Sequence, residues 1–298
     1  MRRSAKGVMR LLILPALLIC LATACIGRGG DARPTYSVSY PMQKVLLERI
    51  AGDRFNINTL IPPGTNPESY DPSVSTLVSL EKSKAFFRLN TPGFEQSVMA
   101  RTGRNYAGLD LVDADKGIVR IEGTHGHGEE DPHIWNSVRN ARVMAANMAS
   151  YLASTDKGNA SAYRKNASRL DDDLRALDDS IASILSGAKG ASFVVMHPSL
   201  SYFARDYGLH QIAMETEGKE ATPRQLAERM NAARRSGAKV MVHDREHSSA
   251  QAETIARQLG LRLVLVSLNG YDWEDNLVKL AREIAAGAAE SNTEPDNG

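Results

Sequence analysis

Hydrophobic and polar residues alternate in short runs along the first third of the chain. Two alternating runs are separated by a helical pattern in which Leu46, Leu47 and Ile50 share one face. The runs comprise Tyr36, Val38 and Tyr40, and then Phe55, Ile57 and Thr59. A helix from Ser73 to Lys82 and an apolar strand from Ala85 to Leu89 are predicted to follow. Strands that alternate with helices in this way predict an α/β lobe with a mostly parallel sheet.

The middle of the chain has the spacing of long helices. A helical pattern from Val138 to Ala153 is interrupted around residues 156–158, and a second pattern should begin near Asn159 and end before Gly187. One apolar stripe follows the second pattern in steps of three or four residues: Leu170, Leu174, Leu177, Ile181 and Ile184. Such a helix would be more than about 35 Å long, at roughly 1.5 Å per residue. We interpret it as one long, rigid strut that joins two lobes.

Strands and helices alternate again in the last third, which predicts a second, similar α/β lobe. Its short apolar strands are predicted at residues 193–196, 240–242 and 263–266. Helices are predicted at residues 223–236 and 249–259, each followed by a glycine in the place of a C-cap, Gly237 or Gly260. A last helix is expected at residues 275–289.

The first 25 residues have the pattern of an export signal. Basic residues precede an apolar run from Leu11 to Ala22, which is shorter than the ~20 residues needed to span a bilayer. The run ends in Ala22-Thr23-Ala24-Cys25, which is typical of a lipobox and predicts a lipid anchor at Cys25; an ordinary signal peptide is the alternative. The expected location is extracytoplasmic, periplasmic or at the cell surface, with the protein anchored to the membrane.

The predicted division of the chain follows from these patterns. It comprises a signal peptide and lipobox at 1–25, a tether at 26–34, an N-terminal α/β lobe at 35–157, a linking helix at 158–187, a C-terminal α/β lobe at 188–290, and a disordered tail at 291–298.

Charge and cysteine content narrow the functional classes. The formal net charge is +1, from 36 basic and 35 acidic side chains, which is not the basic footprint of a nucleic-acid-binding protein. The only cysteines are Cys20 and Cys25, so the mature body has neither a disulfide nor a thiolate ligand. The chain has no Gly-x-Ser-x-Gly motif, which would indicate a serine nucleophile, and no glycine-rich loop that would bind phosphate.

Histidine is scarce in the chain, and its distribution indicates a metal site. Of seven histidines, three fall within nine residues: His125, His127 and His133. The first two alternate with glycine, so we expect them to capture a metal ion without fixing its geometry. His133 lies between a proline and an apolar pair, which should hold it against the core. Imidazole is a preferred ligand of zinc.

Two further candidates lie at the ends of predicted strands. His197 directly follows the strand at 193–196, where ligands bind in α/β sheets. Glu68 lies in the Pro-rich loop after the second strand, and taken alone it is a helix-start or surface carboxylate.

Several segments resemble the metal-binding components of zinc and manganese ABC importers, the cluster A-I (cluster 9) solute-binding proteins. In chain order, they are the loop from Pro62 to Pro72, Asp131-Pro132-His133-Ile134-Trp135, His197 with Tyr202 to Leu209, Glu217 to Glu220, and Tyr271-Asp272-Trp273. The resemblance covers nearly the whole mature chain. It implies two α/β lobes bridged by one long helix, with the metal site in the cleft between the lobes.

The same resemblance implies a set of metal ligands. Glu68 occupies the place of the family's first ligand, usually a histidine, and His133 and His197 match the second and third. The fourth is usually an aspartate, but Ser267 is aligned with it, and the next carboxylate is Asp272, which we predict to be the fourth ligand. Other carboxylates that remain open for this role are Glu217, Asp244 and Glu246.

The resemblance further implies that the chain captures a metal ion, Zn2+ rather than Mn2+, for an ABC permease and its ATPase. We expect a monomer that is not an enzyme and that binds no nucleic acid. A manganese-binding protein of the same family, a surface adhesin or metal chaperone, and a zinc hydrolase are the alternatives. The last lacks a His-Glu-x-x-His helix, and no general base can be singled out for it.

Overall fold

A computed structural model describes residues 33–102, 108–123, 130–215, 221–247 and 251–293 of the chain. The chain divides after Pro34, and residues 35–298 form a unit of their own, which is the subject of this section. Cys25, the histidines His125 and His127, and residues 294–298 lie outside the described residues.

The first lobe is built on a four-stranded parallel sheet with the strand order β2-β1-β3-β4. Its strands are β1 (Thr35–Val38), β2 (Asn56–Thr59), β3 (Ala85–Arg88) and β4 (Asp110–Asp113). Its helices are α2 (Pro41–Ala51), α3 (Val74–Glu81), α4 (Phe94–Thr102) and α5 (Val138–Thr155). The predicted elements are confirmed, and α4 and β4 are additions that the hydrophobic pattern did not predict. The two central strands are buried, so their apolar residues form the core of the lobe.

The second lobe repeats this design with the strand order β6-β5-β7-β8, again entirely parallel. Its strands are β5 (Ser192–Val195), β6 (His210–Ala213), β7 (Val240–Asp244) and β8 (Arg262–Val266). Its helices are α7 (Ser201–Tyr207), α8 (Pro223–Arg235), α9 (Ala252–Leu259) and α10 (Trp273–Thr293). Gly260 ends α9 in the left-handed conformation, with φ of 67°, as predicted for a C-cap glycine. The prediction missed α7 and β6, and α10 continues to Thr293, beyond its expected end.

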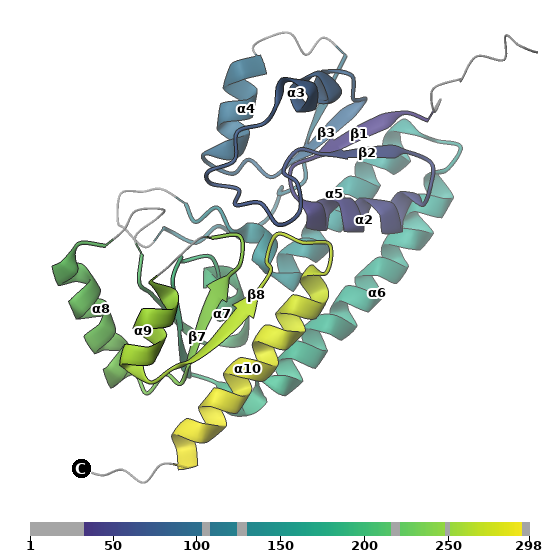
Figure 1. The fold of residues 1–298 in the computed structure, drawn as a ribbon. Coiled ribbons are helices and arrows are strands. Elements are labelled where there is room, and N and C mark those ends of the chain that lie inside the picture. Colours follow the sequence, from purple (N-terminus) through teal and green to yellow (C-terminus); the bar gives the residue numbers. More distant parts are fainter. Residues whose placement is uncertain (1–32, 103–107, 124–129, 216–220, 248–250, 294–298) are drawn as a thin grey trace, which may run out of the picture. The chain divides into compact units, whose positions relative to one another are not determined.

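One long helix, α6 (Ala160–Ile184), joins the two lobes (Figure 1). The predicted stripe faces the core, since Leu170, Leu174 and Ile181 are fully buried. The helix ends three residues before Gly187 and continues into the short 3₁₀ helix η2 (Ser186–Ala188). The predicted strut between two parallel-sheet lobes is therefore confirmed.

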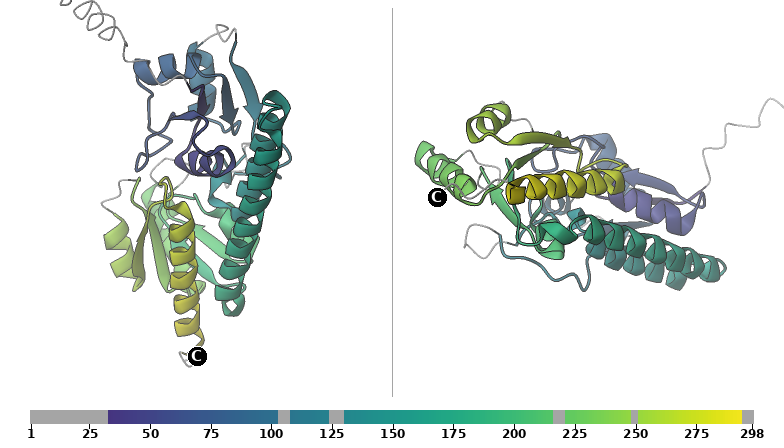
Figure 2. Two further views of the ribbon diagram at one scale, coloured as in Figure 1. Left: turned by 90° about the vertical axis from the view of Figure 1, so that its right-hand side faces the viewer. Right: turned by 90° about the horizontal axis from the view of Figure 1, so that it is seen from below.

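The lobes share one continuous hydrophobic core, which limits how far they can move independently. Helix α10 packs against α6, as the rotated views of Figure 2 also show. A single cluster of buried apolar residues contains side chains of both sheets together with those of α6 and α10. At the edge of this cluster Arg49 of α2 forms ion pairs with Asp173 of α6, at 2.6 Å, and Glu274 of α10, at 2.8 Å.

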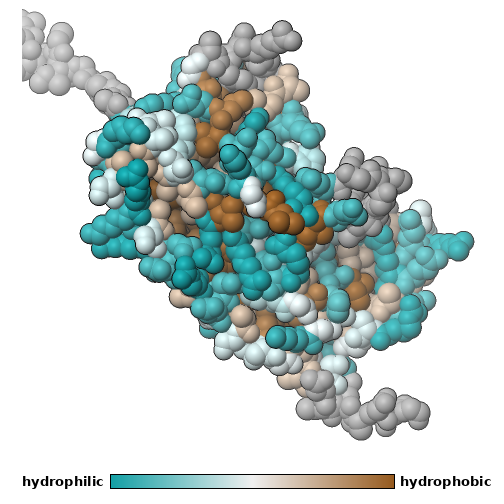
Figure 3. All heavy atoms as spheres, turned by 180° about the vertical axis from the view of Figure 1, so that it is seen from behind, coloured by the Kyte–Doolittle hydropathy of each residue, from teal (hydrophilic) through white to brown (hydrophobic). Residues whose placement is uncertain are grey.

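The surface is mainly polar on the face seen from behind, where hydrophobic residues form small separate groups (Figure 3). Within the described residues, none of the helices combines the length and the hydropathy needed to cross a membrane.

The stripe of α6 allows a test of the strut. Replacing Leu174 by alanine should lower the free energy of unfolding by about 2–5 kcal/mol, because the side chain is fully buried and its loss leaves a cavity. Leu177→Ala, on the same stripe but only half-buried, is the matched control and should cost clearly less. Denaturant unfolding monitored by circular dichroism measures both. Equal losses for the two variants would contradict the described packing.

Candidate metal centre

Three of the predicted site residues meet at one place, although they are far apart in the sequence. Ligand atoms of Glu68, His133 and His197 all lie within 4.8 Å of one another. Glu68 Oε1 is 3.0 Å from His197 Nε2 and 3.6 Å from His133 Nε2, and the two Nε2 atoms are 3.1 Å apart. The ligand atoms of a tetrahedral zinc ion lie about 3.3 Å from one another, given zinc–nitrogen bonds of about 2.0–2.1 Å. The three atoms therefore already have the spacing of a zinc site.

His133 is fixed from both sides of its ring. It caps the 3₁₀ helix η1 (Ile134–Asn136), and its own backbone N–H donates to Asp131 Oδ1 at 2.8 Å. The ring Nδ1 lies 2.9 Å from the same oxygen. Trp135 packs edge-on against the imidazole and stacks in turn on Tyr40 of the first lobe. These contacts hold the ring so that Nε2 faces the other ligands.

Asp131 also determines which nitrogen of His133 carries the proton. Burial raises the pKa of the Asp131 carboxyl, but the hydrogen bond and the positive charge of His133 outweigh this effect and lower it. An ionised carboxylate can only accept a hydrogen bond, so Nδ1 of His133 is the donor. Nε2 is then left with the lone pair that a metal ligand needs.

His197 reaches the group from the carboxyl end of β5, one of the two central strands of the second sheet. Its side chain is fully buried, and its Nδ1 lies 3.9 Å from Oε2 of Glu215, two residues after β6. The carboxyl ends of adjacent parallel strands lie at the same edge of the sheet, where ligands of α/β proteins bind. His197 therefore lies at the carboxyl end of a strand, as predicted.

Glu68 is held in place by a loop that is bound to the second lobe. Asn269 donates from Nδ2 to the Thr65 carbonyl at 2.8 Å, and its own carbonyl accepts from Gly64 N–H at 2.9 Å. Gly64 has φ of 73°, which favours glycine at this turn. The loop between β2 and α3 thus carries Glu68 to the histidines.

The ionisation of Glu68 depends on these histidines. Burial raises the pKa of its carboxyl, but the hydrogen bond to His197 and the charges of His197 and His133 outweigh burial and lower it. Glu68 is therefore an anion at neutral pH and can offer an oxygen ligand to a cation.

The remaining candidates lie apart from this group. Asp272 is exposed, and its carbonyl accepts from Asn276 N–H at the start of α10, so the structure does not bring its carboxylate to the three ligands. Ser267 donates its hydroxyl to Glu246, whose other oxygen accepts from Leu268 N–H at 3.2 Å. Glu217, the capture histidines His125 and His127, and Cys25 lie outside the described residues.

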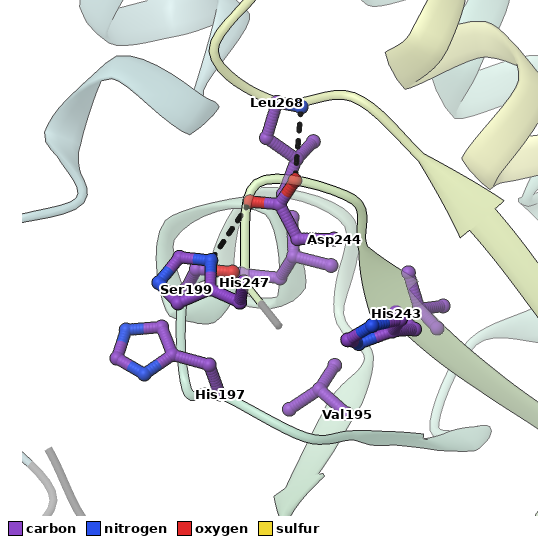
Figure 4. Close-up of a pocket in the computed structure, with 9 residues that line it drawn as sticks. Val195, His197, Ser199, His243, Asp244, His247 and Leu268 are labelled. Atoms are coloured by element: carbon purple, nitrogen blue, oxygen red, sulfur yellow. Dashed lines mark hydrogen bonds and ion pairs between the residues drawn. The ribbon is translucent and has the colours of Figure 1, made fainter. Parts of the chain in front are cut away.

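A fourth histidine, which the sequence analysis did not single out, lies beside the group. The His247 ring stacks on that of His197, with centroids 4.3 Å apart and planes at 12° (Figure 4). Asp244, at the end of β7, lies 3.4 Å from His247 Nδ1. His247 follows β7 by three residues, as His197 follows β5 by two. The carboxyl ends of neighbouring parallel strands lie at the same edge of a sheet. The position of His247 just after a predicted strand could therefore have indicated that it lies near His197.

Two parallel-sheet lobes that share a long helix and bring a carboxylate and two imidazoles together define a solute-binding protein with a site for a divalent metal ion. The chain belongs to the family described as zinc-uptake complex component A, periplasmic, which matches residues 37–287. The predicted resemblance to cluster A-I proteins is thereby confirmed.

Relatives and solved structures agree with this assignment. The zinc-binding lipoprotein AdcA of Streptococcus pneumoniae is 27% identical over 89% of this chain, which spans only 56% of that relative. The high-affinity zinc uptake system protein ZnuA of Bacillus subtilis is 26% identical, over 83% of this chain and 82% of its own. A crystal structure of ZnuA superimposes with a TM-score of 0.80 at 30% identity, covering 86% of this chain and 99% of that one. The manganese complex of FpvC from Pseudomonas aeruginosa shares the fold, with a TM-score of 0.76 at 22% identity over 87% and 99% of the two chains.

The lowered pKa of Glu68 predicts how the metal-free protein responds to acid. A carboxyl whose pKa is lower in the folded state stabilises the fold above its unfolded value of 4.5, and this contribution is lost as pH falls through the folded-state pKa. The wild type should therefore lose more stability than Glu68→Gln between neutral and strongly acidic pH. Urea unfolding of both proteins in the presence of a chelator measures the difference. Parallel stability curves would show that Glu68 does not interact with the histidines.

Proposed function

We propose that the chain is the extracytoplasmic solute-binding component of an ABC importer, and that it captures Zn2+ for high-affinity uptake. The observation that carries this proposal is the convergence of Glu68, His133 and His197 from two lobes to within 4.8 Å. Membership of the zinc-uptake family supports it, as do the names of the zinc-binding relatives. Zinc is here the transported cargo and not a resident cofactor.

The ligand types favour zinc over manganese. Two neutral imidazoles and one carboxylate are a common zinc set, whereas manganese prefers oxygen ligands. The nearest additional carboxylates, Asp131 and Glu215, face the Nδ1 atoms of the histidines. Both lie on the far side of the imidazoles from Glu68, where a carboxylate can orient a ligand.

The partners and the location belong to the same proposal. A permease and its ATPase would receive the ion, and a lipid anchor at Cys25 would keep a monomeric protein at the outer side of the membrane. His125 and His127 would capture zinc before it reaches the buried ligands. A permease gene and an ATPase gene beside this one would distinguish import from a role as an adhesin or metal chaperone.

Removal of the three ligands tests the proposal directly. The full chain, purified in detergent without a polyhistidine tag, should bind zinc in a calorimetric titration. The triple variant Glu68→Ala, His133→Ala, His197→Ala should lose this binding. Each single variant should lose more than the roughly 10- to 100-fold that removal of an orienting neighbour costs.

His210→Ala is the matched control, because His210 is an exposed histidine on β6 outside the group. It should bind zinc like the wild type. If the triple variant bound zinc as tightly as the His210 control, the proposed site would be wrong.

The metal preference can be tested at Glu68. Glu68→His replaces an oxygen donor and its charge by an imidazole, so zinc should still bind while manganese binding weakens. The ratio of the zinc to the manganese dissociation constant, measured by competition with a chelator dye, should fall. Glu68→Gln, which keeps an oxygen but loses the charge, separates the two effects. A larger loss of affinity for zinc than for manganese in Glu68→His would argue against the proposed role of this carboxylate.

A further inference from the structure

The described site supplies three ligand atoms to an ion that is usually bound by four. The residue aligned with the expected fourth ligand, Ser267, donates its hydroxyl to Glu246 instead. Asp272 is exposed and lies outside the group. A fourth ligand from the second lobe has to come from another residue near His197.

His247 has the properties of an unused ligand. Its side chain is only 11% exposed, and within the described residues neither ring nitrogen has a hydrogen-bond partner. Burying an imidazole without satisfying its nitrogens is costly, and such a cost is offset when a metal ion accepts one of the lone pairs. Its ring stacks on that of His197, one of the three residues of the group, so it is the next histidine outward from the site.

The three histidines around the group share one arrangement, in which Nδ1 faces a carboxylate. The pairs are His133 with Asp131 at 2.9 Å, His197 with Glu215 at 3.9 Å, and His247 with Asp244 at 3.4 Å. At His133 the carboxylate is hydrogen-bonded to Nδ1 and keeps the proton there, which leaves Nε2 as the ligand atom. At His197 and His247 a carboxylate lies near Nδ1 without a hydrogen bond in this structure, so Asp244 is placed to orient His247 once the ring moves.

The neighbourhood gives the His247 ring space to turn. A small cavity of about 10 Å³ lies between His197, His247 and the end of β7. Figure 4 shows Asp244 above this cavity, with its two oxygens directed to His247 and to the backbone of Leu268, and His243 on the opposite side. The volume corresponds to about one water molecule, so the packing around the His247 ring is not completely filled on this side.

We infer that His247 is the fourth ligand of the transported ion, and that Asp244 is the positioning residue that directs its Nε2. On metal binding the ring leaves its stack on His197 and completes a tetrahedron of three imidazole nitrogens and one Glu68 oxygen. This inference rests on the proposed function and makes it more specific. Three nitrogens and a single oxygen favour zinc over manganese, and they compensate for the serine at position 267.

X-ray absorption at the zinc edge tests the inference, because multiple scattering counts coordinated imidazoles. The zinc-loaded wild-type chain should show three imidazoles. His247→Ala should show two and should bind zinc at least roughly 10- to 100-fold more weakly. Asp244→Asn should weaken binding over the same range and disturb the orientation of the third imidazole. His243→Ala removes a histidine from the other side of the same cavity, and it should keep both the three imidazoles and the wild-type affinity.

Each alternative result has a distinct meaning. Two imidazoles in the wild type, or unchanged affinity in His247→Ala, would overturn the inference and leave the site of Glu68, His133 and His197 intact. Loss of affinity in Asp272→Ala without loss in His247→Ala would assign the fourth position to the carboxylate and also overturn it. A wild-type chain that binds no zinc would overturn the proposed function itself. A count of two imidazoles in the wild type overturns the inference even if a variant fails to fold.

Discussion

The structure depends on one electrostatic constraint, the approach of two buried imidazole nitrogens and a carboxylate oxygen. The Nε2 atoms of His133 and His197 lie 3.1 Å apart, with Glu68 Oε1 3.0 Å from the second. Because Asp131 keeps a proton on Nδ1 of His133, its Nε2 presents a lone pair. Lone pairs and a negative charge at such distances repel one another unless a cation lies among them. The fold thus holds together two buried imidazoles and a partly exposed carboxylate, a set of atoms that is complete only when a proton or a metal ion is added.

The rest of the architecture keeps these atoms at their positions. His197 depends on the carboxyl end of β5, and His133 depends on a turn whose Trp135 stacks on Tyr40. Glu68 depends on hydrogen bonds from its loop to Asn269 in the other lobe. The continuous core along α6 and α10 prevents the lobes from drifting apart. Side chains from distant segments can therefore keep a spacing that a metal ion requires.

An element or site residue could be predicted from the sequence where the residues around it form a clear pattern. The long stripe of α6 was predictable because its apolar residues repeat over many positions. The edge strands β4 and β6 are as long as the predicted strands, but polar residues occupy half of their positions, and α7 has only seven residues. His133 and His197 could be identified from their apolar neighbours and from a strand end. Glu68 could not be identified without the family resemblance, because its role depends on the long-range contact of its loop with Asn269.

At the fourth position the structure does not bring the predicted residue to the other three side chains. Attention to carboxylates led to Asp272, but the turn at residues 269–270 is held towards the Glu68 loop, and Asp272 is left at the exposed start of α10. His247, which we infer to be the fourth ligand, follows a strand that pairs with that of His197, and the sequence analysis did not use this signal.

The same contacts bear on how a cargo ion can leave. Parting the lobes as rigid bodies would separate α10 from α6 and expose their shared core to water. Moving the Glu68 loop breaks its hydrogen bonds to Asn269 and the contact of Glu68 with His197, and leaves the shared core in place. Turning His247 back onto His197 removes a second ligand within a cavity that already exists. We therefore expect a docked permease to act on the loop rather than on the lobes.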